Sequence, residues 1–179
     1  MGQGPVSVHH DIPWLPPGSF VEVWLGDVPT PDDLCTSAFA LPFMDDGNVL
    51  FTTVLKRGLD IPGGHVEPTD ADPEAAAVRE TLEETGATVR VIGKVGHLRI
   101  VVPDPPDGYR YPPESYQPFY AAVVEETGPV LMPQECGPPT SVPPDVAAAD
   151  ARFALHRDII LAASAMFGDL APSSPANRA

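Results

Sequence analysis

The sequence predicts a single mixed α/β or α+β domain. Short runs of β-forming residues, bounded by turn residues, recur on both sides of one well-defined helix signal, and an apolar helical stretch follows near the C-terminus. The length of 179 residues agrees with this. A chain of that size buries roughly 70% of its unfolded surface and needs neither disulfides nor metals to fold.

The first half of the chain alternates strand and turn signals. Residues 1–17 contain prolines and few periodic apolar residues, so we expect a loosely docked N-terminal arm. Residues 20–25 are rich in β-formers and predict the first strand. Apolar runs at 36–43 and 49–55 are split by Asp-Asp-Gly-Asn, which predicts a hairpin. A loop rich in Gly, Pro and Asp is expected over 58–72.

The clearest helix covers residues 73–85. Asp72 suits its N-cap, Pro73 suits the first helical position, and Glu74 favours the positive end of the helix dipole. Gly86 is a natural C-terminal stop.

The second half repeats this pattern with more proline. The expected elements are strands at 88–92, 97–102 and 119–124, Pro-rich connections at 103–118 and 129–145, and a largely helical stretch at 146–167. A domain over residues 18–168 and a flexible tail over 169–179 complete the prediction.

The composition restricts the partners. The formal net charge is -15, from 25 acidic and 10 basic residues, which disfavours nucleic acid and anionic membranes. A small phosphorylated substrate remains compatible if metal ions stand between carboxylates and phosphates. Cys35 and Cys136 form no metal-like spacing and are expected to be reduced thiols. The N-terminus lacks a signal-peptide pattern, so a cytoplasmic location is the expectation.

The helix 73–85 carries two contrasting faces. A helical wheel places an apolar stripe opposite three carboxylates. The stripe consists of Ala75, Val78 and Leu82, and the carboxylates are Glu80, Glu83 and Glu84. Taken alone, such a carboxylate cluster is most often a solvated helix face.

The loop before this helix favours a functional interpretation. Gly63 and Gly64 permit a tight turn and the close approach of a ligand. Glu67 follows them and can bring a fourth carboxylate towards the helix, which would make an oxygen-rich cage for Mg²⁺ or Mn²⁺. Arg79 lies between the two faces and can orient a carboxylate.

These two segments together resemble the Nudix box. The matching residues are Gly63-Gly64-His65-Val66-Glu67-Pro68, then Arg79-Glu80-Thr81-Leu82-Glu83-Glu84-Thr85-Gly86-Ala87. The stretch between Gly64 and Arg79 is one residue longer than the pattern, and Asp70 or Asp72 stands in place of the loop glutamate. Thr81 and Ala87 also occupy positions where aliphatic residues are usual. The extra residue precedes the helix, so the register of the helical carboxylates is unchanged.

The resemblance implies a Nudix fold, a mixed β-sheet sandwiched between α-helices. It also implies Mg²⁺-dependent hydrolysis of a nucleoside diphosphate linked to another group, X. By motif match, Glu83 and Glu84 would be principal metal ligands, with Glu80 a ligand or the base that activates water. Glu67 and the Gly64 backbone would support the metal site, and Arg79 would hold the glutamates in place.

Weaker signals point to substrate contacts. Tyr109, Arg110, Tyr111 and Tyr116 lie in the loop 103–118, either as a lid that stacks on a base or as a Pro-stiffened surface loop. His65 can point into the substrate groove or be merely hydrogen-bonded. Further carboxylates outside the box are often used in the family, and the candidates are Glu125, Glu126 and, first to be tested, Glu135.

Three functions follow from the resemblance. We favour a MutT-like nucleoside triphosphate pyrophosphohydrolase that releases a monophosphate. One alternative is an ADP-ribose or nucleotide-sugar pyrophosphatase, for which Pro103, sixteen residues past Ala87, is the motif match. The other is a nucleotide sensor without turnover. Homodimers are common in the family, although no interface stripe here demonstrates one.

Overall fold

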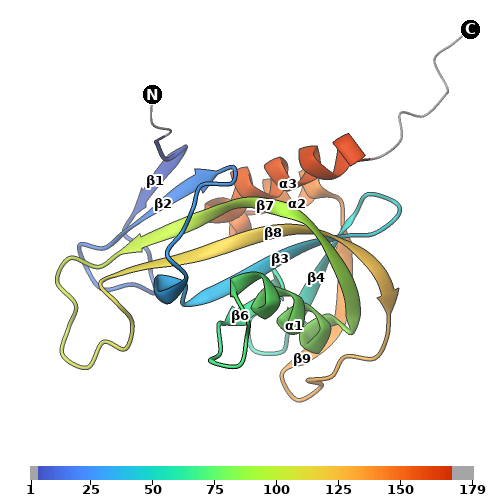
Figure 1. Cartoon of the computed structure of the whole chain (residues 1–179), viewed down its shortest axis with the longest axis horizontal. Helices are drawn as coiled ribbons and strands as arrows, with labels where there is room; N and C mark the ends of the chain where they lie inside the picture. The colour runs from blue at the N-terminus through green and yellow to red at the C-terminus, as the bar shows by residue number, and fades with distance from the viewer. Residues whose placement is uncertain (1–3, 171–179) are drawn as a thin grey trace, which may run out of the picture.

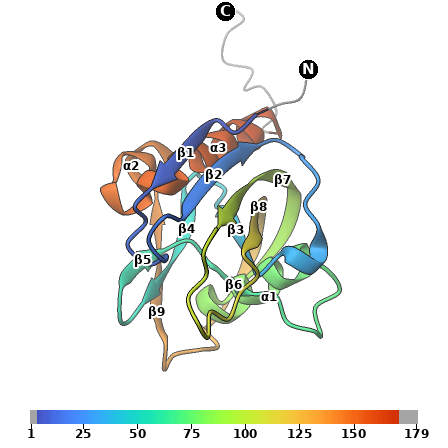
Figure 2. The same cartoon turned by 90° about the vertical axis from the view of Figure 1, so that its left-hand side faces the viewer.

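A computed structural model of the chain describes residues 4–170. These residues form one nine-stranded sheet with helices on both faces. Figures 1 and 2 show α1 on one side of the sheet and α2 and α3 on the other. The predicted fold class, a mixed sheet between helices, is therefore confirmed.

The sheet follows the order β1-β2-β7-β8-β3-β4-β5, with β6 added to β3 and β9 added to β4. The strands are β1 (Ser7–His10), β2 (Phe20–Leu25), β3 (Ser37–Phe43), β4 (Val49–Val54), β5 (Gly58–Asp60), β6 (Gly63–His65), β7 (Ala87–Val101), β8 (Glu114–Thr127) and β9 (Cys136–Val142). The pair β3–β8 is parallel and the other named pairs are antiparallel.

The predicted hairpin at residues 43–49 forms, but its two strands separate at once. Phe43 and Val49 are the paired residues, beyond which β3 pairs with β6 and β8 while β4 pairs with β5 and β9. Helix α1 (Pro73–Thr85) contacts β3, β4 and β6, the strands on either side of this divergence. Gly63 and Gly64 of β6, which we call the glycine turn, thus lie next to the carboxylates of α1.

Three expected loops contain strands. The segment 58–72 includes β5 and β6, and the connection 129–145 includes β9. The connection expected at 103–118 ends at residue 113, because β8 begins at residue 114. Within residues 4–170, β9 pairs with β4 alone, and as an edge strand it tolerates Pro138 and Pro139. The two strands expected at 88–92 and 97–102 are one strand, β7, whose register shifts near Gly93 and Gly96.

The N-terminal arm is more ordered than expected. Its residues 7–10 pair with β2 and extend the sheet, instead of docking loosely. At the other end, helix α2 (Pro144–Ala149) and a 3-10 turn (Ala151–His156) precede α3 (Arg157–Leu170). Residues 169 and 170 of the predicted tail are thus helical, and residues 171–179 lie outside the described part of the chain.

Helix α1 begins and ends where the sequence predicts. The Asp72 carboxylate accepts a hydrogen bond from the Ala75 amide at 2.8 Å, and Gly86 adopts a left-handed conformation with φ 72°. The face that packs on the sheet differs from the predicted stripe. Its buried residues are Pro73, Ala76, Ala77, Thr81 and Thr85, whereas Ala75, Val78 and Leu82 are only partly buried.

Small side chains explain this helix orientation. Ala76 and Ala77 pack on Ala38 and Ala40 of β3, so the helix lies close to the sheet. The Thr81 hydroxyl donates to the Ala77 carbonyl at 2.7 Å, and the Thr85 hydroxyl donates to the Thr81 carbonyl at 2.6 Å. The wheel did not anticipate that these hydroxyls could be satisfied within the helix and buried.

The larger core fills the opposite face, beneath α3. Ile159, Ile160 and Ala163 are buried there, and the Phe167 ring stacks on Phe43 at 4.7 Å between centroids. The largely helical stretch predicted at 146–167 is therefore confirmed, and its last helix packs on the sheet. Both cysteines are free and buried. In residues 4–170, no helix has the length and hydropathy needed to cross a membrane.

Candidate active site

A cavity of about 350 Å³ opens between the glycine turn and helix α1. Its wall includes Gly63, Gly64 and His65 from β6 and Glu80 and Glu84 from α1. The other lining residues are Ser37, Phe39, Val54, Arg57, Met132, Glu135 and Cys136. We call this the carboxylate cavity.

Gly63 passes too close to its neighbours to carry a side chain, and a side chain at Gly64 would displace the Glu80 carboxylate. A Cβ atom at Gly63 would lie 2.5 Å from Cδ1 of Phe39 and would also collide with the Ala38 carbonyl oxygen. One at Gly64 would lie 2.5 Å from Oε1 of Glu80. The two glycines therefore bring bare backbone against the helix carboxylates.

Glu84 is held at the inner wall of the cavity. Its Oε2 accepts a hydrogen bond from the Gly63 amide at 3.1 Å, and the Cys136 thiol lies 3.8 Å from its Oε1. Burial raises the pKa of Glu84 to about 7, despite the Gly63 hydrogen bond, which acts in the opposite direction. Burial likewise raises the pKa of Glu80. Two partly desolvated carboxylates in one cavity are a favourable setting for a cation.

Arg79 connects the helix to the preceding loop. Its Nε and Nη2 donate to the two Asp70 oxygens at 2.9 Å each, and Nη2 also donates to the His65 carbonyl. Its Nη1 donates to Glu80 at 3.0 Å and Glu83 at 3.3 Å. Hydrogen bonds from Arg79 hold the pKa of Asp70 below its usual range. The Asp70 carboxylate thus fixes the arginine, while Asp72 caps the helix.

The chemistry of the donors fits a hard divalent cation, although the carboxylates are not arranged around one. Among residues 4–170, no three His, Cys, Asp or Glu side chains stand close enough to hold a metal ion as they are. Glu80 and Glu83 are turned to Arg79, and Glu84 is turned to Gly63. All three offer carboxylate oxygens, the ligand type that Mg²⁺ and Mn²⁺ prefer.

The remaining predicted residues divide into two groups. His65 and Glu135 line the carboxylate cavity, and Tyr109 lines an adjoining one with Tyr111 and His65. Glu67 is exposed, and its backbone amide donates to Asp70. Arg110 is exposed on the loop before β8 and lines none of the cavities described here.

Tyr116 lies elsewhere, beside Trp24, His97, Arg99 and Glu114 in a separate cavity. Its hydroxyl donates to Glu114 at 2.5 Å, and Glu114 is paired with Arg99. Tyr116 lies in β8, where successive side chains point to opposite faces of the sheet. Its ring is therefore on the face opposite to the side chains of its immediate neighbours in the strand.

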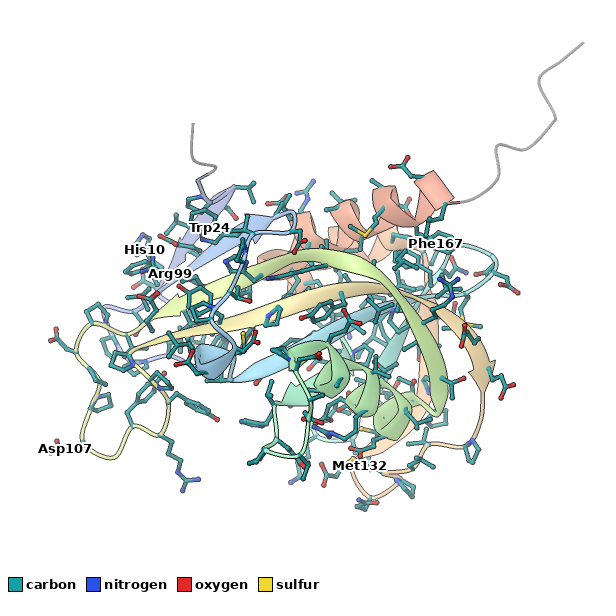
Figure 3. The ribbon with its side chains drawn as sticks, in the orientation of Figure 1. His10, Trp24, Arg99, Asp107, Met132 and Phe167 are labelled. Carbon is teal, nitrogen blue, oxygen red and sulfur yellow. The ribbon has the colours of Figure 1, made fainter. Side chains whose placement is uncertain are left out.

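Sequence reasoning missed Arg57 and Cys136. Arg57 lines the carboxylate cavity at the β4–β5 turn, where its Nε pairs with Asp60 at 2.6 Å. The sequence offers a signal for Arg57, because it stands six positions before a Gly-Gly pair in a chain with only 10 Lys and Arg. Cys136 arrives through β9, a strand that the proline content concealed. Met132, labelled in Figure 3 near α1, lines the cavity because its amide donates to the Glu83 carbonyl.

A family model of the NUDIX domain matches residues 34–163. The chain belongs to the Nudix hydrolase family. The matched segment contains the glycine turn, helix α1 and every residue that lines the carboxylate cavity.

Individual relatives agree with this membership. The chain is 42% identical over 55 residues to the Bacillus subtilis (strain 168) protein named "Putative 8-oxo-dGTP diphosphatase YtkD". That match spans 31% of this chain and only about a third of the relative, 34% of its length.

Solved structures resemble the fold of this Nudix protein. The Bacillus subtilis pyrophosphohydrolase BsRppH superposes with a TM-score of 0.62 at 23% identity, covering 84% of this chain and 91% of that one. A NUDIX hydrolase from Nitrosomonas europaea superposes with a TM-score of 0.53 at 20% identity, over 75% of this chain and 89% of its own.

Proposed function

We propose that this Nudix protein hydrolyses the diphosphate bond of a nucleoside diphosphate linked to X, with Mg²⁺ as its cofactor and Mn²⁺ as the alternative. The favoured substrates are nucleoside triphosphates, which would release a monophosphate. The observation that carries the proposal is the carboxylate cavity, where Glu80 and Glu84 face bare glycine backbone in a site large enough for phosphate groups.

Glu80, Glu83 and Glu84 are the residues that would hold the cation, with the Gly64 backbone beside them. When bound, the cation supplies charge neutralisation for the phosphate oxygens and lowers the pKa of coordinated water. Glu80 is also the candidate for the base, because it lines the cavity and burial raises its pKa. Glu67, exposed near this cluster, has a supporting role at most.

Two arginines have distinct roles in the proposal. Arg79 positions Glu80 and Glu83 and ties them to the loop through Asp70. Arg57 lies at the cavity wall with 63% of its side chain exposed and is held by one carboxylate, Asp60. A substrate phosphate can therefore recruit the Arg57 guanidinium without uncovering a buried charge.

The preference for triphosphates rests on the similarity to YtkD, whose name states 8-oxo-dGTP as substrate. The ADP-ribose alternative rests on Pro103, which is exposed and lines neither the carboxylate cavity nor the adjoining one. The triphosphate assignment is therefore the one we carry forward.

A substrate panel tests the proposal. Purified protein is incubated with dNTPs, 8-oxo-dGTP, ADP-ribose, sugar nucleotides and dinucleoside polyphosphates, in Mg²⁺, in Mn²⁺ and in EDTA, and the products are separated by chromatography. Monophosphate plus pyrophosphate from a triphosphate, lost in EDTA, is the expected result. AMP plus ribose 5-phosphate would instead select the ADP-ribose alternative. Saturable binding without any release would select the sensor.

A matched pair of variants ties the activity to this cavity. Glu84→Gln should abolish most turnover, whereas Glu74→Gln, on the same helix but outside the cavity, should not. Equal activity of the two variants would contradict the site assignment.

A further inference from the structure

A second cavity, of about 260 Å³, joins the carboxylate cavity at Ser37 and His65, which line both. It is lined by Trp14, Leu15, Thr36, Ser37, His65, Ile100, Tyr109, Tyr111, Ser115 and Gln117. We call it the aromatic cavity, because Trp14, Tyr109 and Tyr111 contribute rings to it together with the imidazole of His65. None of its lining residues within 4–170 is a Lys or Arg, so it suits an uncharged group rather than a phosphate.

The arm delivers Trp14 to this cavity in a partly exposed position. Upstream, β1 is hydrogen-bonded to β2, and the flanking Ile12 and Leu15 pack against the main core. Trp14 between them keeps 59% of its surface exposed. A large aromatic side chain that is held at a cavity by anchored neighbours, yet is not itself buried, can gain contact area from a ligand.

The other rings brace one another. The Tyr111 hydroxyl and His65 Nε2 are hydrogen-bonded at 2.9 Å, and their rings are stacked with centroids 6.0 Å apart. Tyr109 meets Tyr111 edge-on at 5.9 Å. Both tyrosines belong to the β7–β8 loop, which extends from the same end of the sheet as the arm in Figures 1 and 2. The ring cluster is therefore preorganised without help from Trp14.

We propose that the aromatic cavity binds the nucleobase of the substrate and that Trp14 stacks on it. The proposal rests on the proposed function for the phosphate side of the same substrate. Aromatic faces stack on any base, and the Gln117 amide can both donate to and accept from a base edge. A base in this cavity would direct its phosphates past His65 towards Glu80 and Glu84. Trp14 and Leu15 precede the matched family segment, so part of the base site lies outside it.

Intrinsic fluorescence tests binding without turnover. The chain has two tryptophans, Trp14 and Trp24, and Trp24 lies in the separate cavity beside Tyr116. In Trp24→Phe, only Trp14 remains to report. With EDTA present, AMP, GMP, CMP and UMP are titrated, and ribose 5-phosphate serves as the baseless probe.

The expected result is saturable quenching by at least one nucleoside monophosphate and none by ribose 5-phosphate. The reciprocal variant Trp14→Phe, which retains Trp24, should show no comparable change. Absence of quenching by all four monophosphates, or equal quenching by ribose 5-phosphate, would overturn the proposal.

Kinetics give a second, independent measurement. Removing a base-stacking ring weakens binding about 5- to 140-fold. Trp14→Ala should therefore raise KM by that factor for the best substrate of the panel, with a smaller effect on kcat, and Trp14→Phe should recover most of the loss. Circular dichroism and the melting temperature should match the parent protein, because Trp14 is largely exposed. A KM within twofold of the parent value would refute the stacking role.

The two proposals fail in different ways. If no compound is hydrolysed but monophosphates quench Trp14, base binding stands and the hydrolase proposal falls. If triphosphates are hydrolysed while Trp14 is neither quenched nor needed for KM, the hydrolase proposal stands and the base site lies elsewhere.

Discussion

Glu84 shows how one residue can serve activity at the expense of stability. Burial raises its pKa to about 7, so above that pH the folded protein holds a carboxylate charge that the unfolded chain would solvate better. Because the folded pKa is raised, the unfolded chain releases the proton first as pH rises, and stability falls between about pH 4.5 and 7.

The Glu84→Gln variant should therefore lose activity and gain stability. We expect kcat to fall by about 10²- to 10³-fold, the loss typical when one group that supports stabilisation of transition-state charge is removed. In EDTA at pH 8, the free energy of unfolding should rise by on the order of 1 kcal/mol, since Gln removes the charge and solvent screening limits the gain. Urea denaturation of both proteins at pH 8 measures the second effect, and a destabilised variant would contradict it.

Arg57 provides a second prediction at this scale. Substitution by Ala removes the guanidinium that faces the carboxylate cavity and should raise KM for a triphosphate about tenfold, the lower end for a charge-assisted hydrogen bond at an exposed site. Arg90→Ala is the control, because Arg90 pairs with Glu125 away from this cavity. Steady-state kinetics should separate the two variants, and matching KM values would remove Arg57 from the site.

At the scale of the element, helix α1 depends on its cap. Asp72→Ala removes the hydrogen bond to the Ala75 amide and should cost about 1 kcal/mol, which lowers the melting temperature by about 2–4 °C for a chain of this size. Asp107→Ala, on the exposed β7–β8 loop, should leave the melting temperature within 1 °C, on the order of a neutral surface change. Differential scanning calorimetry of both variants makes the comparison, and equal shifts would refute the capping contribution.

The sequence signals that succeeded were local ones. The ends of α1 follow from Asp72, Pro73 and Gly86, whose preferences act within one turn of the helix. The strands that sequence reasoning missed depend on distant partners: β9 exists because β4 offers it an edge, despite Pro138 and Pro139.

The parts of the candidate site likewise differ in whether they depend on local sequence or on distant partners. Glu80 and Glu84 share a cavity wall because they are four residues apart on one helix, a spacing readable from sequence. Arg57, Cys136 and Trp14 reach the two cavities only through strand pairing and arm docking. Nothing close to Cys136 or Trp14 in the sequence predicts this placement, whereas Arg57 stands six positions before Gly63.

At the scale of the whole molecule, two histidines, the buried His97 and the partly buried His156, make folding sensitive to acid. Burial lowers the pKa of His97 and of His156 to about 4. Lys94 adds to the effect at His97, whereas Asp60 opposes it at His156. Both imidazoles are therefore neutral in the folded protein near neutral pH, while the unfolded chain takes up protons near pH 6.5.

The two histidines should accordingly lower stability as pH drops from about 6.5 to 4, by up to about 1.4 kcal/mol per pH unit each. This contribution opposes that of Glu84, which raises stability as pH drops from about 7 to 4.5. Urea denaturation across this range measures the slope. His156→Leu should flatten the profile, and His10→Leu, near the surface on β1, serves as the control. An unchanged slope in His156→Leu would show that folding does not lower the pKa of this imidazole.

The pairing of β1 with β2 has a consequence for how the protein behaves in concentrated solution. β1 covers the hydrogen-bonding edge of β2 with four residues of the arm. Without them, β2 would present a bare strand edge, and such edges recruit copies of themselves into aggregates. With β1 in place, the strand at this edge is four residues long instead of six, and a shorter edge strand offers fewer unpaired backbone groups to another copy of the chain. Removal of the arm should therefore favour self-association.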